Sequence, residues 1–151
     1  MVPRWIGEKP MTSLANEVTA QIVSLDDRMT FLPRLFGQRC FLLGERAVYK
    51  YADHFSADYR EAGGYWNFYG LTNGSGFMAP ATDRKTLSFV SNMNGYGGEF
   101  SPEAFGIVVT CFALTRCWEE MRTDELVRKL DGLKDYAAQH PEHAAIFAAL
   151  D

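Results

Sequence analysis

The residues best suited to metal binding or proton transfer in this 151-residue chain are its three histidines. A zinc site or a catalytic triad needs partners that converge in space. His140 and His143 straddle Pro141, where a helix is predicted to begin, and they do not form an HExxH pattern. His54 follows Asp53 on the polar side of another predicted helix. We therefore expect all three histidines to be solvated and expect no metal site.

Two residues are candidate nucleophiles. Ser75 stands in a Gly-Ser-Gly sequence, but the GxSxG elbow of hydrolases has a different spacing and joins a strand to a helix, whereas the residues around Ser75 indicate a hairpin. Cys40 would need a lowered thiol pKa, and nothing in its sequence context indicates one. We predict no catalytic residue, and a hydrolase that uses Cys40 or Ser75 is the least favoured of three possible functions, after the two given at the end of this section.

A glycine-rich segment, NGYGG at residues 94–98, could in principle hold a phosphate group. It matches neither GxxxxGK[ST] nor GxGxxG. Glu99 stands between these glycines and the next predicted helix, and its carboxylate would repel an anion. We interpret the segment as a turn with a bulged strand and expect no cofactor.

Aromatic residues crowd the segment 65–69. In a strand, Trp66 and Phe68 point to one face while Tyr65 and Tyr69 point to the other, so one pair is expected in the core. The other pair either packs at the rim of the core, stacks on single-stranded nucleic acid or contacts a protein. Because residues 61–83 contain no lysine or arginine, protein contact is the better functional interpretation.

Composition indicates one globular domain over residues 1–151, with residues 1–10 as a loose leader. The chain is 47% hydrophobic, and its net charge of −4 comes from interspersed acidic and basic residues. It lacks both the basic stripe of a nucleic-acid-binding protein and the carboxylate rows of a DNA mimic. The three cysteines cannot all pair within one chain, and there is no secretory signal and no apolar run of ~20 residues. These features predict a cytoplasmic protein without a membrane segment.

The predicted elements alternate helices with two hairpins, which gives an α+β fold. Residues 11–25 are predicted as a helix, with a strand as the alternative, and a short helix follows from Asp26 or Asp27 to Gly37. Residues 44–58 show the apolar stripe of an amphipathic helix. Two hairpins then turn at Asn73-Gly74 and Asn94-Gly95, and we expect their strands to form one antiparallel sheet of about four strands.

Three further helices are predicted after the hairpins. The sequence Ser101-Pro102-Glu103 is a strong helix start, and the apolar residues that follow surround the first half of a helix reaching residue 121. We expect this helix to be central and buried on the sheet. Helices at 123–139, where Gly132 is a weak point, and at 141–150 complete the chain.

Three stretches in order resemble the ArdB/KlcA family of antirestriction proteins from plasmids and other mobile elements. They are RMTFLPRLFG at 28–37, GGYWNFYGLTNG at 63–74 and NGYGGEFS at 94–101. The resemblance implies an α+β fold. It also implies inhibition of DNA cleavage by type I restriction-modification enzymes, which protects incoming DNA, by a protein of ordinary charge rather than a DNA mimic.

Together these observations predict a non-enzymatic inhibitor. Its expected partner is the type I restriction-modification complex or a host factor that controls it, and the alternative is a protein that binds DNA directly and shields it from nucleases. The predicted contact residues lie at turns and strand edges, where they can supply hydrogen bonds and aromatic area. They are Tyr65, Tyr69, Asn73, Asn94 and Tyr96.

Overall fold

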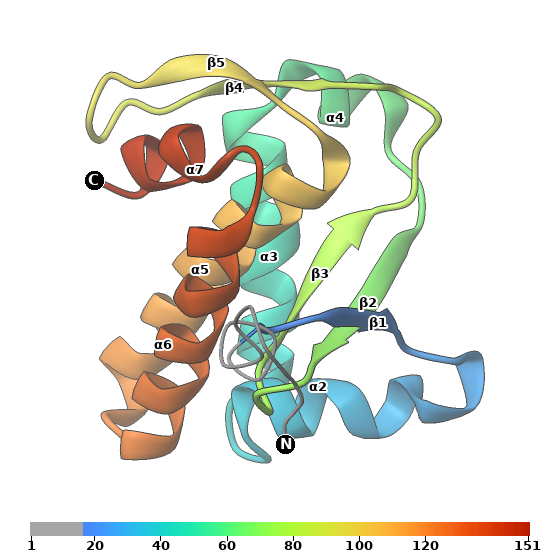
Figure 1. Cartoon of the computed structure of the whole chain (residues 1–151), viewed down its shortest axis with the longest axis vertical. Coiled ribbons are helices and arrows are strands. Elements are labelled where there is room, and N and C mark those ends of the chain that lie inside the picture. Colours follow the sequence, from blue (N-terminus) through green and yellow to red (C-terminus); the bar gives the residue numbers. More distant parts are fainter. Residues whose placement is uncertain (1–16) are drawn as a thin grey trace, which may run out of the picture.

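The computed structural model describes residues 17–151. The predicted loose leader at 1–10 and the first part of the predicted helix at 11–25 lie outside the described residues. Element labels follow Figure 1. In chain order the elements are β1 (Ala20–Ile22), the 3₁₀ turn η1 (Leu25–Asp27), α2 (Arg28–Phe36), α3 (Phe41–Phe55), α4 (Ala57–Ala62), β2 (Trp66–Leu71), β3 (Gly76–Pro80), β4 (Leu87–Val90), β5 (Gly97–Phe100), α5 (Pro102–Met121), α6 (Asp124–Gln139) and α7 (His143–Leu150).

The predicted α+β class is confirmed, but the predicted single sheet is wrong. β2 and β3 pair in a three-stranded antiparallel sheet with β1, whereas β4 and β5 form a separate two-stranded sheet. A helix explains the separation. Thr110 of α5 lies against the outer edge of β3, where its Oγ1 accepts a hydrogen bond from the N–H of Met78 at 3.1 Å. A fourth strand therefore cannot pair with the outer edge of β3. Figure 1 shows the β4–β5 hairpin at the top of the view, away from β1 and β2 in its lower half.

The segment before η1 is a strand, so the alternative interpretation of residues 17–25 is the right one. Ala20 pairs with Leu71 and Ile22 with Tyr69. The pairing is antiparallel and joins residues about fifty positions apart in the sequence, so local periodicity could not reveal it.

The first helices follow the prediction with shifted ends. α2 contains Pro33 and ends at Phe36, and its C-cap is Gly37, whose φ of 92° suits glycine. Asp27 occupies the N-cap position, although its side chain makes no cap hydrogen bond. The helix predicted at 44–58 begins earlier and is interrupted at Ser56, which adopts an extended conformation and accepts a hydrogen bond from the N–H of Tyr59 through its hydroxyl. This cap starts α4.

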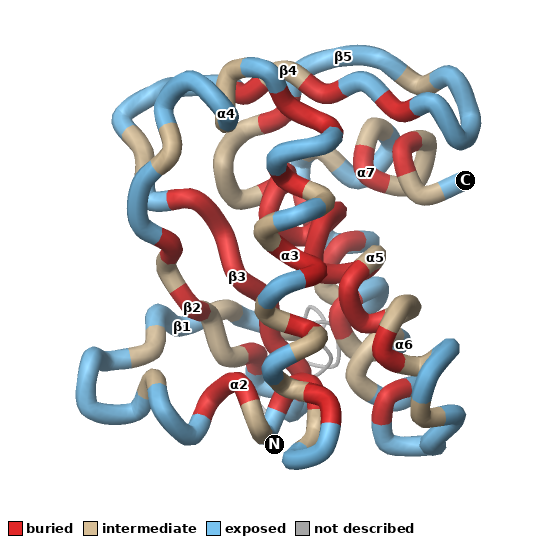
Figure 2. Tube along the Cα trace, turned by 180° about the vertical axis from the view of Figure 1, so that it is seen from behind, coloured by how far each residue is buried: buried red, intermediate tan, exposed pale blue. Residues whose placement is uncertain are grey.

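Helix α5 occupies the centre of the fold, as predicted. Ser101 caps it by accepting the N–H of Ala104 at 3.2 Å, and most of its residues are buried (Figure 2). Gly106 permits its contact with the sheet, because a Cβ there would lie 2.2 Å from the carbonyl oxygen of Met78.

Helices α6 and α7 pack on α5 and complete a single buried hydrophobic cluster. The helix predicted at 123–139 is α6, and its residues Leu126, Leu133 and Ala137 are buried. α7 begins at His143, two residues after the predicted start. Among residues 17–151, no helix has both the length and the apolar character that a membrane span requires.

Candidate interaction surface

The two hairpin turns are held against the C-terminal helices by their asparagines. Asn73 donates to the carbonyl of Gly132 in α6 at 2.9 Å and accepts the N–H of Ser75. Asn94 donates to the carbonyls of Ala148 and Ala149 at 3.2 and 3.1 Å, so it caps the end of α7. Both residues are exposed, but their side-chain amides already make hydrogen bonds within the protein.

Two of the predicted contact tyrosines are half-buried. Tyr69 stacks on Phe77 with ring centroids 4.9 Å apart, and Phe77 in turn stacks on Tyr136 of α6. Tyr96 packs near Phe89 and Phe100 inside the second hairpin. Tyr69 and Tyr96 can therefore each expose only part of the ring to a partner.

Tyr65 is the predicted contact residue with a freely accessible ring, since 85% of it is exposed. The predicted alternation is confirmed, because Trp66 and Phe68 are buried at 5% and 6% exposure. Asn67 lies on the same face as Tyr65 and Tyr69, and it is half-buried.

Ile22 joins these residues from the neighbouring strand. It pairs directly with Tyr69, so the two side chains share a face, and 56% of Ile22 is exposed. We call Ile22, Tyr65, Asn67 and Tyr69 the open face of the three-stranded sheet. It belongs to β1 and to β2 with the residue before it, because the β3 residues on the same side, Phe77 and Ala79, are buried. Sequence reasoning missed Ile22, because its place depends on a pairing register with no local signal, whereas period-two alternation from Tyr65 could have identified Asn67.

A hollow of about 690 Å³ lies between β1 and the α5–α6–α7 region. It contains His140, which is buried at 8% exposure, so the expectation of a solvated side chain is wrong. His140 lies between Glu103 and the backbone of Glu142, and these contacts join the start of α5 to the segment between α6 and α7. His54 and His143 are exposed, as predicted.

Both ring nitrogens of His140 have intramolecular partners. The N–H of Glu142 donates to Nδ1 at 3.0 Å, so Nδ1 carries no proton, and Nε2 donates to the Glu103 carboxylate at 2.7 Å. A general base needs a ring nitrogen free to accept a substrate proton. The arrangement is therefore that of a structural polar cluster. Burial and the Glu103 carboxylate also raise the pKa of Tyr136, on the same hollow, to about 12.

The candidate nucleophiles are likewise occupied or inaccessible. Ser75 is buried and its hydroxyl donates to the carbonyl of Lys129. Cys40 is buried at 4% exposure. Burial raises the pKa of the Cys111 thiol to about 12 and also raises that of Cys117, which keeps both in the unreactive thiol form. Within residues 17–151 no group of three or more His, Cys, Asp or Glu side chains is placed to hold a metal ion.

The sequence matches the family model described as "Antirestriction protein" over residues 57–151. The chain belongs to this antirestriction family. The matched region begins at α4 and contains both hairpins and helices α5 to α7.

Individual relatives extend the likeness over nearly the whole chain. An antirestriction protein KlcA of Escherichia coli is 37% identical over 145 residues, which cover 93% of this chain and 100% of the relative. The protein YafX of Escherichia coli strain K12 is 34% identical and covers 89% of both chains.

A solved structure of this antirestriction family shares the fold. It has a TM-score of 0.79 and 39% identity, and the match covers 89% of this chain and 95% of that one. The description of that structure says that the KlcA and ArdB proteins show a novel fold, and antirestriction activity against type I DNA restriction systems in vivo but not in vitro.

Proposed function

We propose that this protein protects incoming mobile-element DNA from type I restriction-modification enzymes by binding a protein, without catalysing a reaction. The observation that carries the proposal is membership of the antirestriction family together with the activity described for KlcA and ArdB. The near balance of 15 basic and 19 acidic residues supports protein binding, because DNA mimicry needs dense negative charge.

The description of activity in vivo but not in vitro bears on the partner. An inhibitor that needs only the purified restriction enzyme would act in both settings. We therefore infer that inhibition needs a component or a state of the restriction system that cells supply. This agrees with a partner that is either the type I complex during its reaction or a host factor that controls it.

The open face is the proposed contact surface. Tyr65 supplies a large exposed ring, Ile22 supplies apolar area, and the half-buried Asn67 and Tyr69 supply polar groups, a combination that is typical of protein interfaces. Tyr96 stays in the proposed contact set as a half-buried rim residue on the other hairpin. We propose that Asn73 and Asn94 act mainly by holding the hairpins in place.

The test is the plating efficiency of unmodified phage on a type I restricting host, with and without this protein, beside a type II restricting host. We expect recovery on the type I host alone. Equal recovery on both hosts would favour general shielding of DNA, and no recovery on either would contradict the proposal.

The surface is tested by the double variant Ile22→Ser with Tyr65→Ala. Both side chains are more than half exposed, so the free energy of unfolding should change by less than about 0.5 kcal/mol. We expect protection on the type I host to fall at least tenfold. Leu42→Ala, at a position 66% exposed on α3, is the matched control and should protect fully. Equal protection by the double variant and the control would rule out this contact surface.

A further inference from the structure

The outer edges of two strands are closed by side chains of neighbouring helices. On β3, Thr110 of α5 accepts the outward N–H of Met78 and donates back to the same residue's carbonyl at 3.4 Å. On β4, Asp58 of α4 accepts the outward N–H of Ser88 at 2.9 Å. Such contacts satisfy backbone groups that would otherwise pair with a foreign strand.

The edge of β1 is closed in part. The side-chain amide of Gln139 both accepts the N–H of Val18 and donates to its carbonyl, at 2.9 and 2.8 Å, as a paired strand would.

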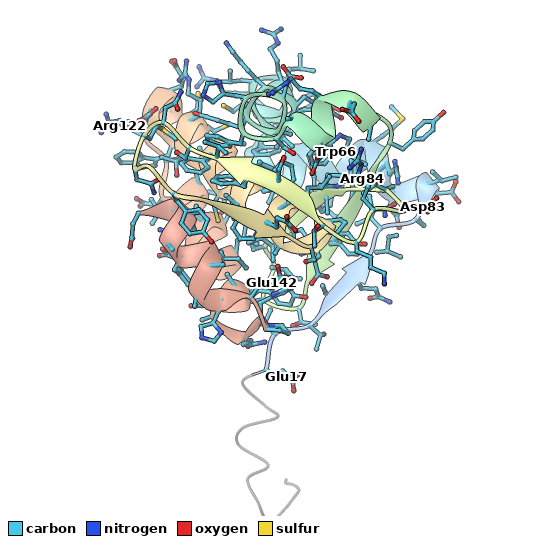
Figure 3. The ribbon with its side chains drawn as sticks, turned by 90° about the horizontal axis from the view of Figure 1, so that it is seen from above. Glu17, Trp66, Asp83, Arg84, Arg122 and Glu142 are labelled. Atoms are coloured by element: carbon cyan, nitrogen blue, oxygen red, sulfur yellow. The ribbon has the colours of Figure 1, made fainter. Side chains whose placement is uncertain are left out.

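The outer edge of β5 differs from the other three. The N–H of Ser91 donates to the carbonyl of Tyr96, and antiparallel alternation from that pair turns the N–H and C=O groups of Gly97 and Glu99 away from β4. Within residues 17–151 these outward groups have no hydrogen-bond partner. Residues 97–99 are all exposed, and Figure 3, seen from above, shows the hairpin lying across this end of the molecule.

Gly97 has no role in the fold that would require glycine. Its φ is not positive, and a Cβ would have only one neighbour within 4 Å, the carbonyl oxygen of Phe89 at 3.8 Å. Gly98 is different, because the hydroxyl of Tyr96 would lie 3.1 Å from its Cβ. Glycine in a strand lowers stability and often marks a place where another backbone approaches closely.

The outer face beside this edge offers one apolar and one acidic group. Val90, which pairs directly with Gly97, is 62% exposed, and the missing side chain at Gly97 leaves it reachable from the edge. The carboxylate of Glu99 accepts the hydroxyl of Thr86 at 2.9 Å, and no lysine or arginine among the described residues lies within ion-pair distance of it. A partner strand with a basic residue beside Glu99 would complement this charge.

We propose that the edge of β5 binds an extended segment of a partner protein, which adds a third strand to the β4–β5 sheet and places a lysine or arginine beside Glu99. Main-chain hydrogen bonds to Gly97 and Glu99 would supply affinity, and contacts with Val90 and Glu99 would supply specificity. The inference rests on the proposed function, since the partner is the protein through which restriction is inhibited.

Gly97→Pro tests the edge directly. Proline removes the outward N–H and fills the edge with its ring, while the hydrogen bonds of the β4–β5 ladder remain because the N–H of residue 97 does not take part in them. Gly97→Ala is the matched control, since it keeps the N–H and its Cβ enters open space. On a type I restricting host we expect the proline variant to lose at least tenfold in phage recovery and the alanine variant to retain full recovery.

Glu99→Lys provides a second variant, at an exposed side chain whose hydrogen bond to Thr86 is its only one among the described residues. It should lose protection by at least fivefold, whereas Glu99→Gln should lose less. Thermal unfolding and soluble yield of each variant show whether it is folded.

The outcomes separate this inference from the proposed function. If the unaltered protein protects, and the folded Gly97→Pro variant and the Glu99→Lys variant protect equally well, the inference alone is overturned. Absence of protection by the unaltered protein overturns both. A dimer in solution that Gly97→Pro dissociates would show that β5 pairs with a second copy, which also overturns the proposal of a foreign strand.

Discussion

Gly106 is the residue on which the packing of α5 against the sheet depends. An alanine Cβ would lie 2.2 Å from the Met78 carbonyl oxygen and 2.6 Å from the Ala79 Cα, and backbone atoms cannot move aside as a flexible side chain can. Overpacking of this kind costs about 3 kcal/mol, and the better helix propensity of alanine returns about 1 kcal/mol. We expect Gly106→Ala to lower the free energy of unfolding by about 2 kcal/mol in urea titrations.

Gly70→Ala is the control for this prediction, because its Cβ would meet nothing within 4 Å. A change of less than about 0.5 kcal/mol is expected there. Similar losses for the two variants would mean that α5 does not approach β3 as closely as described.

Tyr136 should make stability depend on alkaline pH. Its pKa is raised from 10.0 to about 12 by burial and by Glu103. The folded state holds the phenol proton more tightly than the unfolded state does, so this contribution is complete below pH 10 and is lost as the pH rises towards 12. We expect the free energy of unfolding to fall less between pH 9.5 and 11.5 in Tyr136→Phe than in the unaltered protein, as urea titrations at the two pH values would measure. An equal fall in both proteins would contradict this assignment.

At the scale of elements, the hairpins and the C-terminal helices stabilise each other. Asn94→Ala removes both hydrogen bonds to the last turn of α7, and the free energy of unfolding should fall by about 1 kcal/mol. Amide hydrogen exchange of α7 should accelerate relative to that of α5. Asn92→Ala, at an exposed position in the same turn, is the control and should leave exchange in α7 unchanged.

The elements also differ in how well local sequence predicts them. α5 begins at Pro102, as predicted, because its start signal consists of three adjacent residues. The helix predicted at 44–58 is divided at Ser56, since the Ser56 hydroxyl and the Asp58 side chain both contact β4 residue Ser88. Those contacts join residues about thirty positions apart, so the apolar periodicity within 44–58 could not predict the break.

At the scale of the whole molecule, the 15 basic and 19 acidic residues are interspersed along the sequence, and no long segment of it is strongly basic. Because such a segment would displace counterions from DNA, we expect binding to a short duplex at physiological salt to be weaker than about 10⁻⁴ M. A gel-shift titration at two salt concentrations measures this. Micromolar binding that weakens steeply with added salt would instead favour shielding of DNA.

The sequence by itself determined the α+β class, the buried helix, both hairpin turns and the alternation that leaves Tyr65 exposed, because each depends on residues within a few positions of one another. Tertiary structure alone decided that the strands form two sheets, that Ile22 completes the open face, that His140 is buried beside Glu103 and that Asn73 and Asn94 hold C-terminal helices. These features are contacts between distant segments. They depend on where α5 and α6 place their polar groups, which hydrophobic periodicity along the chain does not specify.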